Sequence, residues 1–150
     1  MSKLDKTTLE SIGRSWVEGW NKSNSDEFAE LFREDGEYMD PAFGILRSGR
    51  EYMKFHHLLW HRAISGFRMT YERIIPGDNV VVVQAIGEGR FDGESLGDGK
   101  VVPTGKAFRA RLCAVLAIGD DAKIARCSEY YDRSLMPDGH QAPFRDLDQV

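Results

Sequence analysis

Residues 38–49 read Tyr-Met-Asp-Pro-Ala-Phe-Gly-Ile-Leu-Arg-Ser-Gly and predict a short strand that ends in a carboxylate. Pro41 cannot donate a hydrogen bond to a sheet and favours extended backbone at Asp40. Gly44 and Gly49 permit the tight turns that follow. An acid at the end of an apolar strand, next to such a turn, is well placed to reach the mouth of a cavity. Asp before Pro is also a common turn element, so a structural role for Asp40 stays open.

Hydrophobic periodicity predicts helices in the first part of the chain and strands in the rest. A helix capped by Thr7 or Thr8 carries an apolar face, and a second helix over 26–32 follows a cap at Ser25. A strand over 37–40 and a third helix over about 50–64 come next. Alternating residues then predict strands over 67–75, 80–91, 108–118 and 123–132. This order predicts an α+β fold with helices on one face of a curved, mostly antiparallel sheet.

Length and composition predict one soluble domain over residues 1–150, with a core over about 7–136 and a polar tail over 137–150. The net charge of −4 and scattered basic residues argue against nucleic-acid binding. The sequence shows no apolar run long enough for a membrane span and no signal-peptide core, so we expect a cytoplasmic protein without a membrane partner. Motifs for nucleotides, nicotinamide or metals are missing, and we expect no cofactor.

Four segments together resemble the nuclear transport factor 2-like (cystatin-like) superfamily, in particular ketosteroid isomerases and SnoaL-like polyketide cyclases. They are residues 38–49, the first helix with Trp16-Val17 and Trp20-Asn21, the segment 28–32 followed by Asp35, and Glu129-Tyr-Tyr131-Asp132. The resemblance spans about residues 7–136. It implies three N-terminal helices on a cone-shaped sheet, a pocket for a small hydrophobic molecule, and a homodimer.

The resemblance implies that Asp40 or Glu129 takes a proton next to a carbonyl, and that the other acid, Tyr131 or His57 donates to the developing oxyanion. Asp40 falls on the base that moves a proton next to a carbonyl, and Glu129 falls where limonene-epoxide hydrolase-like proteins keep an acid. Strand alternation places Cys127, Glu129 and Tyr131 on one face, which the resemblance turns towards the cavity. We expect burial and the nearby Asp40 to raise the pKa of Glu129. A register shifted by one residue would instead turn Glu129 to solvent or to a dimer partner.

Three histidines fall on the third predicted helix. His57 and His61 share a helix face, but no third ligand is evident, so we expect no metal site. We expect a neutral His57 in the cavity as a hydrogen-bond partner or proton carrier, and His61 and His140 on the surface. The remaining predicted pocket wall is Trp16, Trp20, Tyr38, Phe43, His56, Trp60 and Cys127. These aromatic residues are also what a plain hydrophobic core would contain.

The chain departs from both groups of enzymes that it resembles. Ketosteroid isomerases have a tyrosine and a protonated aspartate as an oxyanion hole, at positions occupied here by Trp16 and by Ala114 or its neighbour Cys113. Epoxide hydrolases have an Arg and an Asp where this chain has Gln84-Ala85-Ile86. The resemblance therefore favours a small cofactor-independent SnoaL-like enzyme acting on a hydrophobic carbonyl compound by aldol cyclisation, isomerisation or dehydration.

Two further expectations complete the interpretation. The alternative function is a non-catalytic binding module of the same fold for a small apolar ligand. The homodimer is expected to form through the outer face of the sheet, where Arg109, Arg111, Cys113 and Val115 alternate with inward residues.

Overall fold

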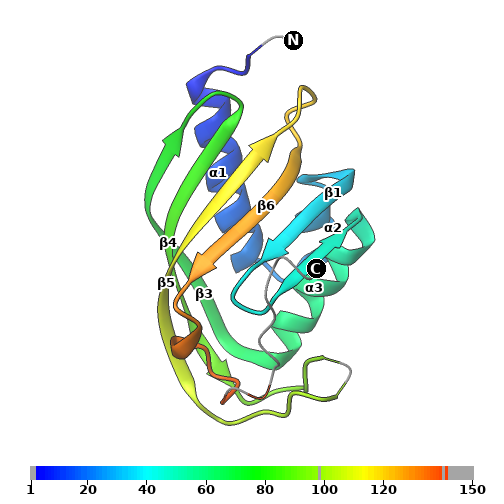
Figure 1. Ribbon diagram of the computed structural model, residues 1–150, viewed down its shortest axis with the longest axis vertical. Coiled ribbons are helices and arrows are strands. Elements are labelled where there is room, and N and C mark those ends of the chain that lie inside the picture. Colours follow the sequence, from blue (N-terminus) through cyan, green and yellow to red (C-terminus); the bar gives the residue numbers. More distant parts are fainter. Residues whose placement is uncertain (1–2, 98, 140, 142–150) are drawn as a thin grey trace.

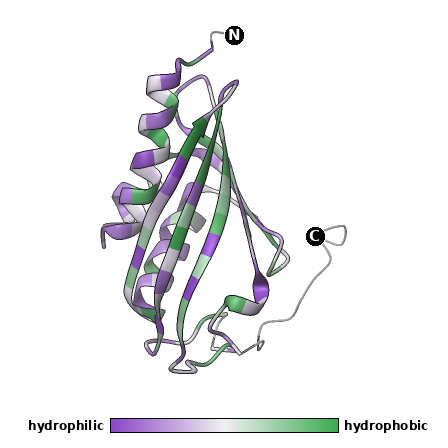
Figure 2. Ribbon diagram, turned by 90° about the vertical axis from the view of Figure 1, so that its left-hand side faces the viewer, coloured by the Kyte–Doolittle hydropathy of each residue, from purple (hydrophilic) through white to green (hydrophobic). Residues whose placement is uncertain are grey.

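The computed structural model describes residues 3–97, 99–139 and 141, which form an α+β fold with one six-stranded sheet. The elements are α1 (Lys6–Asn21), α2 (Ser25–Ala29), β1 (Phe32–Asp40), β2 (Ile45–Ser48), α3 (Arg50–Ala63), β3 (Ile64–Pro76), β4 (Val80–Phe91), β5 (Ala107–Ile118), β6 (Ile124–Tyr131) and the 3-10 turn η1 (Arg133–Leu135). The strand order is β2-β1-β6-β5-β4-β3, and the helices lie on one face of the sheet (Figures 1 and 2). The predicted fold class is confirmed.

The sheet is mixed rather than wholly antiparallel. Strands β1 and β6 run parallel, with Tyr38 opposite Cys127 and Met39 opposite Ser128, whereas the other neighbouring strands are antiparallel. Because β1 and β6 are far apart in sequence, no hairpin forces them to run in opposite directions. Their C-terminal ends therefore lie at the same end of the sheet, which brings Asp40 close to the end of β6.

The second helix is shorter than predicted, and the following strand is longer. Asn24, rather than Ser25, caps α2 by accepting from the Glu27 backbone N–H at 3.0 Å. The helix ends at Ala29 because the Leu31 carbonyl already pairs with Ile124 N–H of β6 at 2.8 Å. Of the predicted last helical turn, Glu30 and Leu31 form a turn and Phe32 begins β1.

Helix α1 also begins earlier than predicted. The Asp5 side chain caps it, accepting from Thr8 N–H at 2.7 Å. Its apolar face packs against β3 and β4 at Gly13, where a Cβ atom would lie 3.0–3.3 Å from side chains of both strands. No helix within the described residues is both long and apolar enough to cross a membrane.

Strand β3 starts at Ile64, immediately after α3, so the predicted break at Ser65-Gly66 is wrong. Gly66 adopts a left-handed conformation with φ of 61°, and the pairing with β4 is irregular between Ser65 and Arg68. A second irregularity lies between Tyr71 and Arg73. Such bulges bend a strand without ending it, and they help curve the sheet around the helices.

The first residues of the predicted loose tail are held against the loop before β5. Thr104 Oγ1 donates to the Pro137 carbonyl, and the Gln141 side chain pairs with both backbone groups of Val102 at 2.8 and 3.0 Å. Arg133 forms a bidentate ion pair with the buried Asp138. His140 and residues 142–150 lie outside the described residues.

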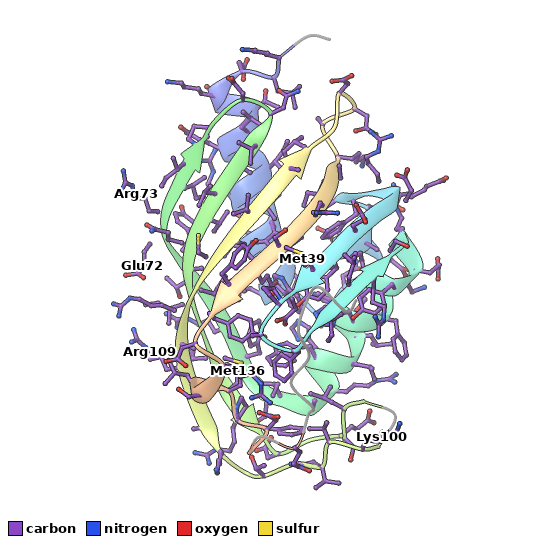
Figure 3. All side chains as sticks on the ribbon, in the orientation of Figure 1. Met39, Glu72, Arg73, Lys100, Arg109 and Met136 are labelled. Carbon is purple, nitrogen blue, oxygen red and sulfur yellow. The ribbon has the colours of Figure 1, made fainter. Side chains whose placement is uncertain are left out.

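The outer face of the sheet carries charged side chains from β3, β4 and β5. Glu72, Arg73 and Arg109 project outward from this face (Figure 3). Arg109 and Arg111 are exposed, as expected, and pair within the chain with Glu88 and Glu72 at 3.3 and 3.0 Å. Dimerisation through this face stays a prediction.

Candidate active site

A cavity of about 390 Å³ lies between the concave face of the sheet, α3 and the segment that follows β6. Most of its wall is apolar and aromatic. The polar and charged side chains in the wall are Tyr38, Asp40, Arg47, Tyr52, His56, Glu129, Tyr131 and Asp138. Four of them, Tyr38, Asp40, Glu129 and Tyr131, form one hydrogen-bonded group, which we call the carboxylate network.

Asp40 occupies the end of β1 and serves both the turn and the cavity. Its Oδ1 accepts from Phe43 N–H at 3.2 Å, as a turn-forming aspartate does. Its Oδ2 accepts from the Tyr131 hydroxyl at 2.6 Å and lies 3.3 Å from that of Tyr38. Burial raises the pKa of Asp40, and these hydrogen bonds, led by that from Tyr131, oppose the rise.

Glu129 faces the interior, as the strand alternation predicts. It is 8% exposed, and its neighbours Cys127 and Tyr131 on the same face are buried and partly buried. Burial, followed by the charge of Asp40, raises the pKa of Glu129 to about 8. The residue opposite it on β5 is Ala114, which offers no side-chain donor. The burial of Glu129 and its closeness to Asp40 thus agree with the expected rise in its pKa.

Tyr38 links the two acids. Its hydroxyl lies 3.0 Å from Glu129 Oε2 and 3.3 Å from Asp40 Oδ2. A phenol hydroxyl has one proton, so Tyr38 can donate to only one of the two carboxyl groups. It can accept from the other carboxyl group only if that group is protonated. Tyr38 lines the cavity, as predicted. Its spacing of two from Asp40 on one strand is the signal that both share a face.

His56 lines the cavity as predicted. Its ring lies 4.6 Å from that of Tyr38 and is stacked on Tyr52 at 5.7 Å. Burial, followed by the nearby His57, lowers the pKa of His56 to about 4. The ring is therefore neutral at physiological pH.

His57 does not line the cavity, so the prediction of a wet histidine there is wrong. Its side chain is fully buried between α1 and α2. Nε2 lies 2.8 Å from the Gly19 carbonyl and therefore carries the proton, and Nδ1 accepts from Ser25 Oγ at 2.7 Å. His61 is also not a simple surface residue, because its Nε2 lies 2.8 Å from the Trp20 carbonyl. Both histidines join α3 to α1.

Two more predicted wall residues lie in the core instead. Trp16 is fully buried on α1, and Cys127 is 1% exposed, but neither lines the cavity. Trp16 belongs to the face of α1 that packs on the sheet. Cys127 shares the inward face of β6 with Glu129 but lies one pleat further from the cavity mouth. Trp20, Phe43 and Trp60 line the cavity as predicted.

Three polar cavity residues, Tyr52, Arg47 and Asp138, were not predicted from the sequence. Tyr52 precedes His56 by four positions on α3, so a helical periodicity that starts from His56 would have found it. Arg47 stands in the quoted stretch, but no strand was predicted over residues 45–48, and its position opposite Tyr38 follows from the pairing of β1 with β2. No sequence pattern indicated that Asp138 lines the cavity, because its position depends on how the segment after β6 folds back. No group of three potential metal ligands occurs among the described residues.

Comparison with protein families now decides the relationship. The model of the SnoaL-like domain matches residues 14–127. The chain belongs to the SnoaL-like family. The matched region contains Asp40, most of the cavity wall and β6 up to Cys127, so Glu129 and Tyr131 lie just beyond it. None of the curated protein sequences matches the chain.

Solved structures share the fold of this SnoaL-like protein at low sequence identity. A Catenulispora acidiphila protein with a ketosteroid isomerase-like fold, in complex with trimethylamine, is 21% identical with a TM-score of 0.72, covering 89% of this chain and 94% of that one. A proposed SnoaL-like polyketide cyclase from Jannaschia sp. CCS1 is 19% identical with a TM-score of 0.72, covering 93% and 99%. An LEH-like epoxide hydrolase from M. tuberculosis is 14% identical with a TM-score of 0.68, covering 89% of each.

Proposed function

We propose that this protein is a cofactor-independent acid–base enzyme that acts on a small hydrophobic carbonyl compound. The observation that carries the proposal is the unequal hydrogen bonding of two buried carboxyl groups in one cavity. Asp40 accepts from a backbone N–H and from tyrosine hydroxyls. Among the described residues, Tyr38 is the one hydrogen-bond partner of Glu129. Pairs of acids in unequal environments divide into a base and an acid near neutral pH.

Asp40 is the proposed base. Donors at 2.6 and 3.2 Å stabilise its ionised form, although burial raises its pKa. A carboxylate with a raised pKa can accept a proton from the carbon next to a carbonyl group. The resulting enolate carries its charge on oxygen, so it needs a nearby donor.

Glu129 is the proposed donor. With a pKa of about 8 it is mostly protonated at pH 7. Its second oxygen, Oε1, makes no hydrogen bond with a described residue, so it is available to a ligand in the cavity. Proton transfer to Asp40 and a hydrogen bond from Glu129 to the enolate oxygen would then occur together. Enolate formation is the shared first step of aldol cyclisation, isomerisation and dehydration.

The energetics of the cavity favour catalysis over simple binding. Burying two carboxyl groups has a free-energy cost, because each loses hydration of its charged form. A binding module for an apolar ligand gains nothing from that cost. Among the solved structures of this fold are a proposed polyketide cyclase and an epoxide hydrolase.

The test is deuterium exchange at the carbon next to the carbonyl of 2-tetralone, followed by NMR in D₂O. The wild-type protein should accelerate exchange, and Asp40→Asn should reduce the acceleration by about 100-fold or more. Asparagine keeps the acceptor for Phe43 N–H, and the tyrosine hydroxyls can accept from its amide, so the variant should remain folded by circular dichroism. Asp92→Asn, at an exposed site, is the control. No acceleration by the wild type, or full activity of Asp40→Asn, would contradict the proposal.

A further inference from the structure

Three polar side chains in the cavity wall are outside the hydrogen bonds of the carboxylate network, and most of their polar groups make no hydrogen bond with a described residue. The Tyr52 hydroxyl and the His56 ring nitrogens make no hydrogen bond with a described residue. The Arg47 guanidinium makes one, from Nη1 to the neighbouring Leu46 carbonyl at 2.9 Å. A guanidinium has five N–H donors, so most of those of Arg47 have no acceptor among the described residues.

The pairing of β1 with β2 turns Arg47 towards the cavity. Arg47 lies directly opposite Tyr38, and Ile45 lies opposite Asp40. Residues directly opposite in an antiparallel pair project from the same face of the sheet, with Cβ atoms about 5 Å apart. Tyr38 faces the cavity, and Arg47 therefore does so too. Since Arg47 is exposed, it occupies the mouth, whereas Tyr38 lies inside.

The distribution of charge in the wall is uneven. Arg47 is the one lysine or arginine among the described residues that line the cavity. No described carboxylate forms an ion pair with it, whereas Arg133, near the same cavity, is paired with Asp138. The positive charge of Arg47 also acts on Tyr52, where it opposes the rise in pKa to about 12 that burial causes. A cation without a carboxylate partner among the described residues and a hydroxyl donor therefore line the same cavity.

We propose that Arg47 and Tyr52 bind a carboxylate group of the substrate at the cavity mouth, while the apolar body of the substrate extends towards Asp40 and Glu129. The substrate class is therefore a small hydrophobic carbonyl compound that also carries a carboxylate. The carbonyl group of this substrate class rests on the proposed function, whereas the carboxylate group is inferred independently of it. Arg47 supplies the planar, paired donors that match a carboxylate, and Tyr52 adds a third donor.

The cavity volume limits the size of such a compound. Its volume of about 390 Å³ lies near the lower end of the range, about 300–1,000 Å³, of pockets that bind small molecules, so it suits a small ligand. A two-ring aromatic acid has this size. The neutral His56 ring, stacked on Tyr52, extends the aromatic surface for such rings beside the anion.

The test compares 2-naphthoate with 2-naphthamide, which have nearly the same shape but differ in charge. Binding is measured by calorimetry at pH 7. The wild-type protein should bind the carboxylate about tenfold more tightly than the amide, the range expected for one charge-assisted pair at a partly exposed site. Arg47→Gln should abolish this preference, because it weakens binding of the carboxylate more than binding of the amide. Arg62→Gln, on the exposed side of α3, is the control and should retain the preference.

Three results would overturn the inference: no preference for the carboxylate in the wild type, the same preference in Arg47→Gln, or no binding of either compound at millimolar concentration. The measurement involves no turnover. Its failure therefore leaves the exchange of 2-tetralone, a neutral ketone, as an independent test of the proposed chemistry. Conversely, loss of that exchange would not remove a preference for 2-naphthoate that depends on Arg47.

Discussion

Replacing Glu129 by glutamine should make the free energy of unfolding less dependent on pH. The pKa of Glu129 rises in the folded protein from the ordinary 4.5 to about 8. Below pH 4.5 the side chain is protonated in both the folded and the unfolded states, so its burial carries no ionisation cost. As the pH rises above 4.5, the unfolded state loses this proton first and becomes relatively more stable. The folded protein therefore loses stability until about pH 8, where Glu129 ionises in both states.

The magnitude follows from the interval between the two pKa values. Each pH unit within it corresponds to about 1.4 kcal/mol, so the loss between pH 4.5 and pH 7 is about 3 kcal/mol as an order of magnitude. Glutamine has nearly the same shape and cannot ionise. The difference in unfolding free energy between Glu129→Gln and wild type should thus move by about 3 kcal/mol in favour of the variant over this range.

Urea denaturation of both proteins at several pH values between 4.5 and 8 measures this difference. Using the change with pH removes the constant effect of exchanging a carboxyl group for an amide. Glu94→Gln, at an exposed position, is the matched control and should show no such change. If the difference between Glu129→Gln and wild type is constant with pH, Glu129 titrates normally in the fold and the reasoning is refuted.

Four other predictions concern the network, the helices and the assembly. Tyr38→Phe removes the hydrogen bond that lowers the pKa of Glu129. The pH above which 2-tetralone exchange declines should therefore be higher in this variant than in the wild type. If that pH is unchanged, Glu129 does not take part in catalysis. Ser25→Ala leaves Nδ1 of His57 without its donor and should lower the unfolding free energy in urea by about 1–3 kcal/mol, against no change for Ser23→Ala. Since burial lowers the pKa of His57, its contribution to stability should be full above about pH 6.5 and decrease at lower pH, and stability that stays constant down to pH 5 would argue against this. Light scattering should give twice the 17.0 kDa chain mass, and a monomer at micromolar concentration would contradict the expected dimer.

The fold could be predicted from the sequence where local patterns and tertiary structure agree. The turn at Pro41 and Gly44 stops β1 at Asp40, and the alternation in β6 fixes the inward face that carries Glu129. The pairing of β1 with β6 could not be predicted, because parallel pairing depends on contacts between distant segments. The start of β3 was missed for a related reason, since the pairing with β4 continues the strand through a glycine that is locally a break.

The site was predicted less completely than the fold. Strand periodicity was sufficient to place Asp40, Glu129 and Tyr131, because alternate residues of a strand share one face, and in these strands that face points into the cavity. It was insufficient for His57, whose position on α3 is consistent with facing the cavity or facing α1. The hydrogen bonds to Gly19 and Ser25 decide between these, and only the packed helices reveal them. Which acid holds the proton likewise depends on partners that the sequence does not specify.

The most direct test of the account is a titration of the carboxyl groups by ¹³C NMR, with the side chains of aspartate and glutamate labelled. The account predicts one glutamate carboxyl signal that titrates near pH 8 and is absent from Glu129→Gln. The Asp40 signal, identified by its absence from Asp40→Asn, should titrate at lower pH, because its donors stabilise the ionised form. A Glu129 signal that titrates near pH 4.5 would contradict the assignment of base and acid. An Asp40 signal that titrates at a higher pH than the Glu129 signal would also contradict it.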